Sequence, residues 1–390
     1  MSPLPFFASY ILLTASALFI SISSLEAQTT TAWDLHKTAD GLHPDGNEQE
    51  MLWLMNRARA NPTAEGVFLA NSGNADINLG ISFFNVNVAL MQQEFAAIPA
   101  KPPAAFDRRL YEASRDHSLA LIARDSQDHD GQFALVDASG FKKTFANVSV
   151  FAFANGPLAA HGALNIDWGP GGTGGMQSGR GHRVAIMSTN SALTNVGLAM
   201  VPDNNPGTEV GPFVFSGAYC GADTAFPNHY NRFLVGTVWR DNNSNGRYDA
   251  GEGLNNVRVQ PGNGTFHAFT GIAGGYAIPA TAVGAVTLTI SGGTLAGTIT
   301  KTATVGASSV LVDVLVTTTP AAQPMAVTSV VRAPNGNLTL QWTGGNAPYQ
   351  VQRSTTLLQG SWQNVGNPVS TTSATVTPTG TKAFYRVTGS

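Results

Sequence analysis

Cysteine is nearly absent from this 390-residue sequence, in which Cys220 is the only one. A disulfide within the chain is therefore excluded, and stability must come from packed cores and from any bound metal ion. Charge is also scarce, because charged residues make up 12% of the chain against about 25% in typical domains. The net charge of −3 provides no basic surface, so we expect no nucleic-acid partner.

Long hydrophobic runs are missing too, with one exception near the N-terminus. Residues 6–22 are uncharged and apolar, and Leu25-Glu-Ala27 follows them. This pattern predicts a signal peptide over residues 1–27, cleaved after Ala27, and hence a secreted or cell-surface protein. No Lys or Arg precedes the run, so an uncleaved membrane anchor is the alternative. No other stretch approaches the roughly 20 apolar residues of a spanning helix.

Helical patterns dominate the part of the chain that follows. Asn47-Glu-Gln-Glu50 has the form of a capping box and predicts a helix that ends at Asn61-Pro62. Residues 107–124 predict a second helix with His117 on its buried stripe, and residues 159–168 predict a third. Residues 145–154 are apolar and fit either a strand or a short helix.

Two histidines stand out in this region. His129 lies in a polar turn, residues 125–131, directly after the second predicted helix. His182 is flanked by glycine and arginine in Gly181-His-Arg183, at the head of a short apolar segment, and residues 195–201 then predict a buried strand. A histidine held by a rigid turn in front of a strand is a candidate for a binding or catalytic site.

The order of these segments resembles the CAP superfamily, which comprises cysteine-rich secretory proteins, antigen 5 and pathogenesis-related proteins. The resemblance covers residues 46–223. This part of the chain is similar to the bacterial, cysteine-poor branch of the superfamily. It rests on Asn56-Arg57-Ala-Arg59, Leu110-Tyr-Glu-Ala-Ser-Arg-Asp-His-Ser118, His129, Gly181-His-Arg183 and Val196-Gly-Leu-Ala199.

That resemblance implies an α-β-α sandwich with a cleft lined by two histidines and two acidic residues, which binds a divalent metal in some members. His129 and His182 match the two histidines. One acidic position falls at Ala146, where the carboxylate is missing, and Asp167 is the stand-in for the other. His161 is a further polar candidate on the same wall of the cleft.

Two hypotheses of function follow. Two imidazoles and one carboxylate can hold Zn²⁺ and leave a position open, so the cleft could belong to a metal-assisted hydrolase in which Asp167 is a ligand or base. The alternative is a CAP-like domain that binds an unknown extracellular ligand or cell-surface component without turnover. We favour binding, because Ala146 removes an expected ligand or general base.

The sharpest motif lies further along, at residues 241–252. Its spacing is that of an EF-hand calcium loop, with the required glycine at position 6 and a bidentate glutamate at position 12. The predicted calcium ligands are Asp241, Asn243, Asn245, the Arg247 carbonyl, Asp249 and Glu252. Strands flank the loop, which resembles the B-type repeats of bacterial surface adhesins. With three carboxylates, we expect weak affinity, about 10⁻⁴–10⁻³ M, and a role in stiffening the β-modules.

The rest of the chain reads as short strands. Residues 317–324 predict a linker, and regularly spaced strands after it resemble a fibronectin type III module. The predicted fold class is therefore multidomain, with an α/β sandwich followed by two all-β sandwich-like modules. The predicted boundaries are residues 1–27 (signal peptide), 28–232 (CAP-like domain), 233–318 (calcium-loop module) and 319–390 (linker and fibronectin type III-like module).

Overall fold

The computed structural model describes residues 29–317 and, apart from residues 346, 359 and 381, residues 325–389. The predicted signal peptide lies outside the described residues, and so does the predicted linker apart from Thr317. Within the described chain, no helix is both long enough and apolar enough to cross a membrane.

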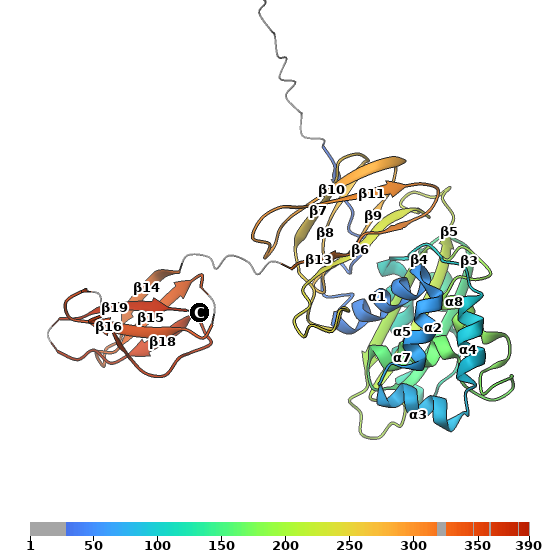
Figure 1. Ribbon diagram of the computed structural model, residues 1–390, viewed down its shortest axis with the longest axis horizontal. Coiled ribbons are helices and arrows are strands. Elements are labelled where there is room, and N and C mark those ends of the chain that lie inside the picture. Colours follow the sequence, from blue (N-terminus) through green and yellow to red (C-terminus); the bar gives the residue numbers. More distant parts are fainter. Residues whose placement is uncertain (1–28, 318–324, 346, 359, 381, 390) are drawn as a thin grey trace, which may run out of the picture.

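The first module is built around a four-stranded sheet (Figure 1). Its strands are β2 (Ala105–Phe106), β3 (Lys143–Ala154), β4 (Asn195–Pro202) and β5 (Phe213–Ala222). They lie in the order β2-β4-β5-β3. Strand β5 pairs antiparallel with both β3 and β4, whereas the short β2 runs parallel to β4.

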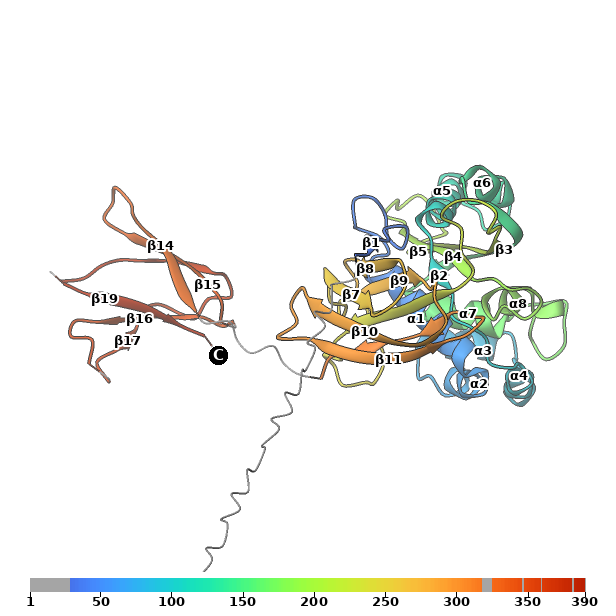
Figure 2. The same cartoon turned by 90° about the horizontal axis from the view of Figure 1, so that it is seen from above.

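Helices cover both faces of this sheet, which gives a helix–sheet–helix layering (Figure 2). The helices are α1 (Gly46–Ala60), α2 (Pro62–Ala70), α3 (Ala75–Phe83), α4 (Val88–Ala96), α5 (Arg108–Arg124), α6 (Gln132–Ala138), α7 (Pro157–Ile166) and α8 (Gly181–Ile186). Helix α5 packs on β4 and β5 and carries α6 beside it, whereas α1, α7 and α8 pack on the opposite face.

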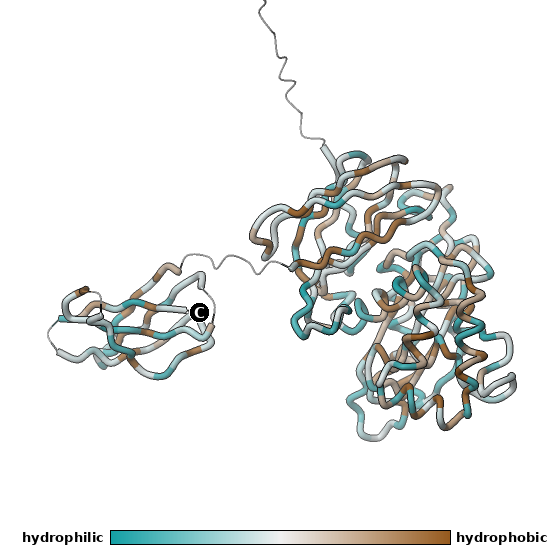
Figure 3. The backbone as a smooth tube through the Cα atoms, in the orientation of Figure 1, coloured by the Kyte–Doolittle hydropathy of each residue, from teal (hydrophilic) through white to brown (hydrophobic). Residues whose placement is uncertain are grey.

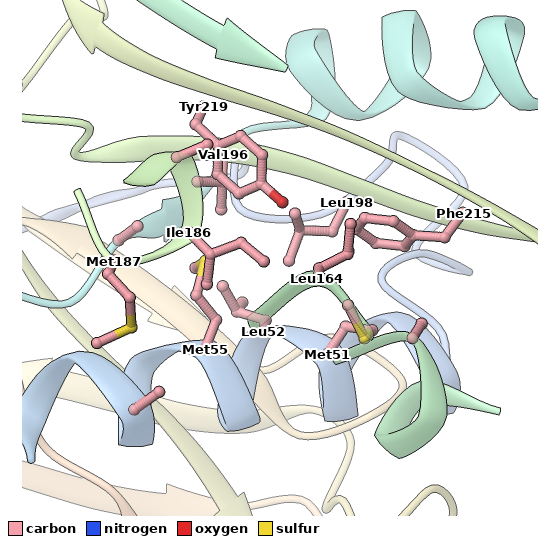
Figure 4. Close-up of a cluster of buried hydrophobic side chains, with 14 of the residues drawn as sticks. Met51, Leu52, Met55, Leu164, Ile186, Met187, Val196, Leu198, Phe215 and Tyr219 are labelled. Carbon is pink, nitrogen blue, oxygen red and sulfur yellow. The ribbon is translucent and has the colours of Figure 1, made fainter. Parts of the chain in front are cut away.

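The main core lies between the sheet and α1, α7 and α8. Figure 4 shows side chains from all of these elements meeting there. The labelled members are Met51, Leu52, Met55, Leu164, Ile186, Met187, Val196, Leu198, Phe215 and Tyr219. Each is almost fully buried, so this cluster supplies much of the burial that a chain without disulfides needs.

The second module contains two sheets that enclose a separate apolar core. One sheet has the order β1-β8-β7-β10-β11, and in the other β6 pairs with β9, β12 and β13. The bounds are β1 (Thr31–Ala32), β6 (Phe233–Trp239), β7 (Val257–Pro261), β8 (Phe266–Phe269), β9 (Gly275–Pro279), β10 (Gly284–Gly292), β11 (Ile299–Val305), β12 (Val310–Leu311) and β13 (Val314–Leu315). Strand β1 therefore joins the second module from the beginning of the described chain. In Figure 3, hydrophobic colouring follows β6 and its neighbours.

Helix α1 is shared between the two modules. While Met51 and Met55 face the first core, Trp53 and Leu54 pack with Trp239 of β6 and with Tyr248 of the following loop. The Trp53 and Trp239 rings meet edge to face with centroids 6.0 Å apart. A helix that is buried on opposite sides has to be apolar on both, which is why α1 lacks a single hydrophobic stripe.

Polar contacts fix this junction. Gln49 donates its amide to the Thr237 hydroxyl at 2.8 Å. The N–H of Ala250 donates to the Glu50 carboxylate at 3.2 Å, so the loop between β6 and β7 is tied to α1 directly.

The third module consists of two three-stranded sheets, β14-β15-β18 and β17-β16-β19. The strands are β14 (Ala326–Arg332), β15 (Leu338–Thr343), β16 (Gln350–Ser354), β17 (Gln363–Asn364), β18 (Ser373–Val376) and β19 (Phe384–Thr388). Side chains from both sheets share one core around Trp342 and Val351, so the module is a small β-sandwich. The multidomain, β-rich character that the sequence predicts is confirmed.

Several predicted elements need correction. The first helix begins at Gly46 because its capping box is formed by Asp45 and Glu48, two residues before the predicted one. Residues 145–154 belong to strand β3, which settles the strand-or-helix alternative. Residues 310–316 form two short strands, β12 and β13, with a break between them. The break allows the intervening Asp313 to accept a hydrogen bond from the N–H of Thr237 at 2.9 Å.

We predict that Asp313 makes the free energy of unfolding depend on pH. Burial raises its pKa from 3.8 to about 6, so the folded state binds this proton more tightly than the unfolded state does. The free energy of unfolding should therefore fall as the pH rises from about 4 to about 6. Asp313→Asn keeps the acceptor oxygen and removes the buried charge. Chemical denaturation should show it about 1–3 kcal/mol more stable than wild type at pH 7.5 and near equal at pH 4.

Asp116→Asn, at an exposed position of α5, is the matched control and should change little at either pH. A loss of stability in Asp313→Asn of the same size at both pH values would contradict the prediction.

Candidate functional site

The structure brings His129 and His182 together, although 53 positions separate them in the chain. Their imidazole rings stack at a centroid distance of 6.1 Å with an interplanar angle of 27°. His129 lies just before α6, and His182 is the second residue of α8. Two elements on different sides of the sheet's end therefore supply one histidine pair.

His182 is oriented by Asp167. Its Nδ1 lies 2.8 Å from one carboxylate oxygen of Asp167, and its backbone N–H donates to the other oxygen at 3.1 Å. Asp167 is buried and caps α7 with a left-handed backbone, φ 58°. The sequence predicts a rigid turn before His182; instead, the residue lies in the first turn of α8. The Asp167 carboxylate therefore lies at the N-terminus of this helix, where a negative charge is favourable. Asp167 thus contacts the Nδ1 side of the imidazole and leaves the Nε2 side without this carboxylate.

His129 is oriented in the same way by a neutral partner. Its Nδ1 lies 2.7 Å from Oε1 of Gln132, and the Gln132 amide donates to the carbonyl of Ser149 on β3 at 3.0 Å. No contact within the described chain occupies Nε2 of His129 or of His182. Both rings therefore keep one nitrogen available, a pattern found behind metal-bound histidines. The role of Gln132 was not predicted, because nothing in a lone glutamine at the start of a helix marks it.

His117 completes the surroundings of His129 from α5. It is fully buried, as the helical pattern predicts, and its Nδ1 lies 3.0 Å from the Ser216 hydroxyl. Burial and, secondarily, the charge of His129 lower its pKa to about 4. His117 is therefore neutral at physiological pH and adds no positive charge to the histidine pair.

Two other candidates lie elsewhere. His161 is fully buried and binds the Glu65 carboxylate at 2.8 Å. It belongs to an internal polar network, so its predicted place on the wall of the cleft is wrong. Ala146 lies on β3 and packs against the apolar cluster that contains Leu110 and Cys220. Burial raises the pKa of that thiol to about 12, so it stays protonated at neutral pH.

An aromatic groove adjoins the histidine pair. We use this name for two neighbouring cavities of about 350 and 280 Å³. Both are lined by Phe84, Phe151, Phe153 and Trp168. The larger cavity also includes His182 in its wall. The side chain of Phe153 is 53% exposed, so the groove offers open apolar surface next to the imidazoles. Aromatic residues from three separate segments of the chain give no sequence signal of this kind.

Trp168 owes its position to a glycine. A Cβ on Gly80 of α3 would lie 2.7 Å from three carbon atoms of the Trp168 ring, so only glycine lets the indole lie against that helix. The same ring lies nearly parallel to the Phe84 ring, with the two ring centroids 6.5 Å apart. Helix α3 and the segment after α7 thereby form one wall of the groove.

As candidate zinc ligands, His129 and His182 supply a suitable pair of imidazole donors, and the remaining positions would fall to water or ligand. A third ligand from the described chain is not in place. Among the residues that the structure describes, the one group of three acidic or histidine side chains whose donor atoms all lie within 4.8 Å of one another is His43, Asp45 and Glu48. Those atoms serve the start of α1: Glu48 accepts from the N–H of Asp45 at 2.9 Å and contacts His43 at 2.7 Å.

The calcium loop has the predicted curl. Gly246 has φ +78°, which favours glycine, and its N–H donates to Asp241 at 2.8 Å. Glu252 accepts from the N–H groups of Asn242 and Asp249, which closes the end of the loop onto its beginning. The amides of Asn243 and Asn245 both reach Asp249.

The donor chemistry of this loop therefore fits calcium. Its three carboxylates, however, do not all lie within 4.8 Å of one another, and the side-chain amides of Asn243 and Asn245 contact Asp249.

Comparisons with known proteins add little. No protein-family model matches the chain, and no relative is found among curated proteins. Among solved structures, a DUF3823 family protein from Bacteroides ovatus is similar at 19% identity, over 40% of this chain and 89% of its own, with a TM-score of 0.18. A "putative carbohydrate binding protein" from Bacteroides uniformis is similar at 10% identity, over 41% and 80%, also with a TM-score of 0.18. These scores are too low to carry an argument about fold or function.

We predict that Asp167→Asn destabilises the protein. Asp167 accepts two hydrogen bonds at a buried site, and the amide nitrogen of asparagine would face one of those donors. The free energy of unfolding should fall by about 1–3 kcal/mol, measured by denaturant unfolding at neutral pH. Asp130→Asn, in the exposed turn beside His129, should change it by less than about 0.5 kcal/mol. Equal effects of the two substitutions would contradict this role for Asp167.

Proposed function

We propose that this is a secreted or cell-surface protein whose CAP-like first module binds an extracellular ligand at the histidine pair and the aromatic groove. The observation that carries the proposal is the pairing of His129 and His182 beside that groove. Cavities of a few hundred Å³ lined by aromatic side chains and a few oriented polar groups are typical of ligand sites. The layering of helices around the sheet supports the CAP resemblance.

The hydrogen bonds of Asp167 favour binding without turnover. Both oxygens of Asp167 are engaged by His182, so this carboxylate orients an imidazole and is not free to act as a base on a bound water. Ala146 supplies no replacement, since it packs in an apolar cluster. The larger cavity, whose wall includes His182, has no Asp or Glu among its lining residues.

A metal-assisted hydrolase is the second candidate. The arrangement Asp167–His182 fixes which ring nitrogen is available, and a carboxylate behind a histidine raises the basicity of a metal ligand. In that case Zn²⁺ would polarise a substrate or activate water. The two candidates differ in whether the full chain binds zinc through the histidine pair and hydrolyses esters or peptides.

The zinc test uses the full mature chain, because α1 is buried between two modules. Calorimetric titration with Zn²⁺ should show a site that His129→Ala and His182→Ala each weaken by at least about tenfold, since either loss removes one of two protein ligands. His43→Ala is the matched control, because it removes the nitrogen of the other candidate cluster. Zinc binding lost only in His43→Ala would place the metal at the start of α1.

Activity then separates the candidates. Zinc at the histidine pair together with ester or peptide hydrolysis that both variants abolish would favour the hydrolase. The absence of turnover in the zinc-loaded protein would leave ligand binding.

We also propose that calcium binds the loop of residues 241–252 and stiffens the junction of the first two modules. The contact of Ala250 with Glu50 supports this, because it ties the loop to α1. Calcium at ten times its dissociation constant should raise the free energy of unfolding by about 1–2 kcal/mol. Asp241→Ala should abolish the effect, measured by thermal unfolding with and without chelator. Asp203→Ala, in another turn with side-chain caps, should keep it.

A further inference from the structure

A polar cavity of about 490 Å³ lies between the first and second modules. It shares no lining residue with the aromatic groove. The first module contributes Lys101 and the segment 188–194, and the second contributes residues 307–309, just before β12. The cavity exists because α1 holds these modules together, and clefts between domains are frequent ligand sites.

The segment 188–194 is held in a fixed shape. Ser188 has a left-handed backbone, φ +54°, and its hydroxyl donates to the carbonyl of Ser191 and accepts from the N–H of Leu193. From beneath, the guanidinium of Arg59 donates to the carbonyls of Ile186 at 2.6 Å and Leu193 at 2.8 Å. The wall of the cavity is therefore preorganised.

Hydrogen-bond donors in this wall are uncommitted. The Lys101 ammonium and the hydroxyls of Thr189, Ser191 and Ser308 make no hydrogen bond within the described residues. The N–H of Ala192 is also without an acceptor there. Lysine has no acceptor atom, so a ligand for this surface has to bring acceptors.

The electrostatics point the same way. No Asp or Glu lines the cavity. Arg59 is 1% exposed, and burial lowers its pKa to about 10, so it remains charged at neutral pH. Arg232 follows the lining residue Asn231 and reaches the carbonyl of Gly306 at 3.1 Å. Among the described residues, Arg59, Lys101 and Arg232 form no salt bridge with a carboxylate.

We propose that this interdomain cavity binds a small hydroxylated molecule that carries a tetrahedral oxyanion, of the sugar phosphate or sugar sulfate class. Lys101 contacts the oxyanion, and the hydroxyls of Thr189, Ser191 and Ser308 bind its oxygens and the sugar hydroxyls. Arg59 acts through the field it creates beneath the wall. This site is independent of the histidine pair and of the calcium loop.

The test is calorimetric titration of the full mature chain with glucose 6-phosphate, inorganic phosphate, inorganic sulfate and glucose. We expect saturable binding of glucose 6-phosphate that weakens as sodium chloride is raised, and none of glucose. Lys101→Ala should weaken binding by about tenfold or more, because one charge-assisted hydrogen bond is lost. Ser308→Trp, at an exposed position, should abolish binding by filling the cavity. Lys382→Ala, an exposed lysine of the third module, is the matched control.

The outcomes divide clearly. Inorganic phosphate or sulfate could bind as tightly as the sugar phosphate and depend equally on Lys101. That outcome would support an oxyanion site and would identify the free anion as its ligand. The absence of saturable binding by every anion overturns the proposal. So does glucose that binds as tightly as glucose 6-phosphate, or an affinity that Lys101→Ala leaves unchanged while thermal unfolding shows both proteins folded.

Discussion

Burial of α1 on two opposite sides is the constraint on which the rest of this structure depends. Met51 and Met55 belong to the core of the first module, and Trp53 and Leu54 belong to a cluster with the second. A single helix thereby contributes to the core of the first module and to the apolar contact with the second. Because α7 packs on α1 and α8 packs on α7, the same helix also determines where Asp167 and His182 lie.

This arrangement makes the first two modules one structural unit. Strand β1, from the beginning of the described chain, pairs with β8 of the second module, and Ala250 of the loop of residues 241–252 contacts α1. The polar cavity between Lys101 and Ser308 exists only while the modules remain docked. A ligand in that cavity would stabilise the docked state, since it would bind groups from both modules.

The histidine pair illustrates how a carboxylate changes its role with position. Asp167 at the end of α7 faces Nδ1 of His182, so it orients an imidazole. A carboxylate on the far side of the ring would instead compete for a metal or a proton. Gln132 gives His129 the same kind of support without charge. The result is two oriented nitrogens beside apolar surface, which suits recognition better than proton transfer.

Local features could be predicted from the sequence: the helix over residues 107–124, the burial of His117, the curl of the loop at Gly246 and the β-rich second half. Periodicity, capping and turn chemistry act over a few residues and can be read from them. The sequence also singled out His129, His182 and Asp167, through a family resemblance. Tertiary structure decided which nitrogen each histidine leaves free, that His161 is an internal residue, and that the aromatic groove and the interdomain cavity exist. Those features depend on contacts between elements far apart in the chain. Packing of α1 between the core of the first module and the second module, and not local preference, determines which side chains meet.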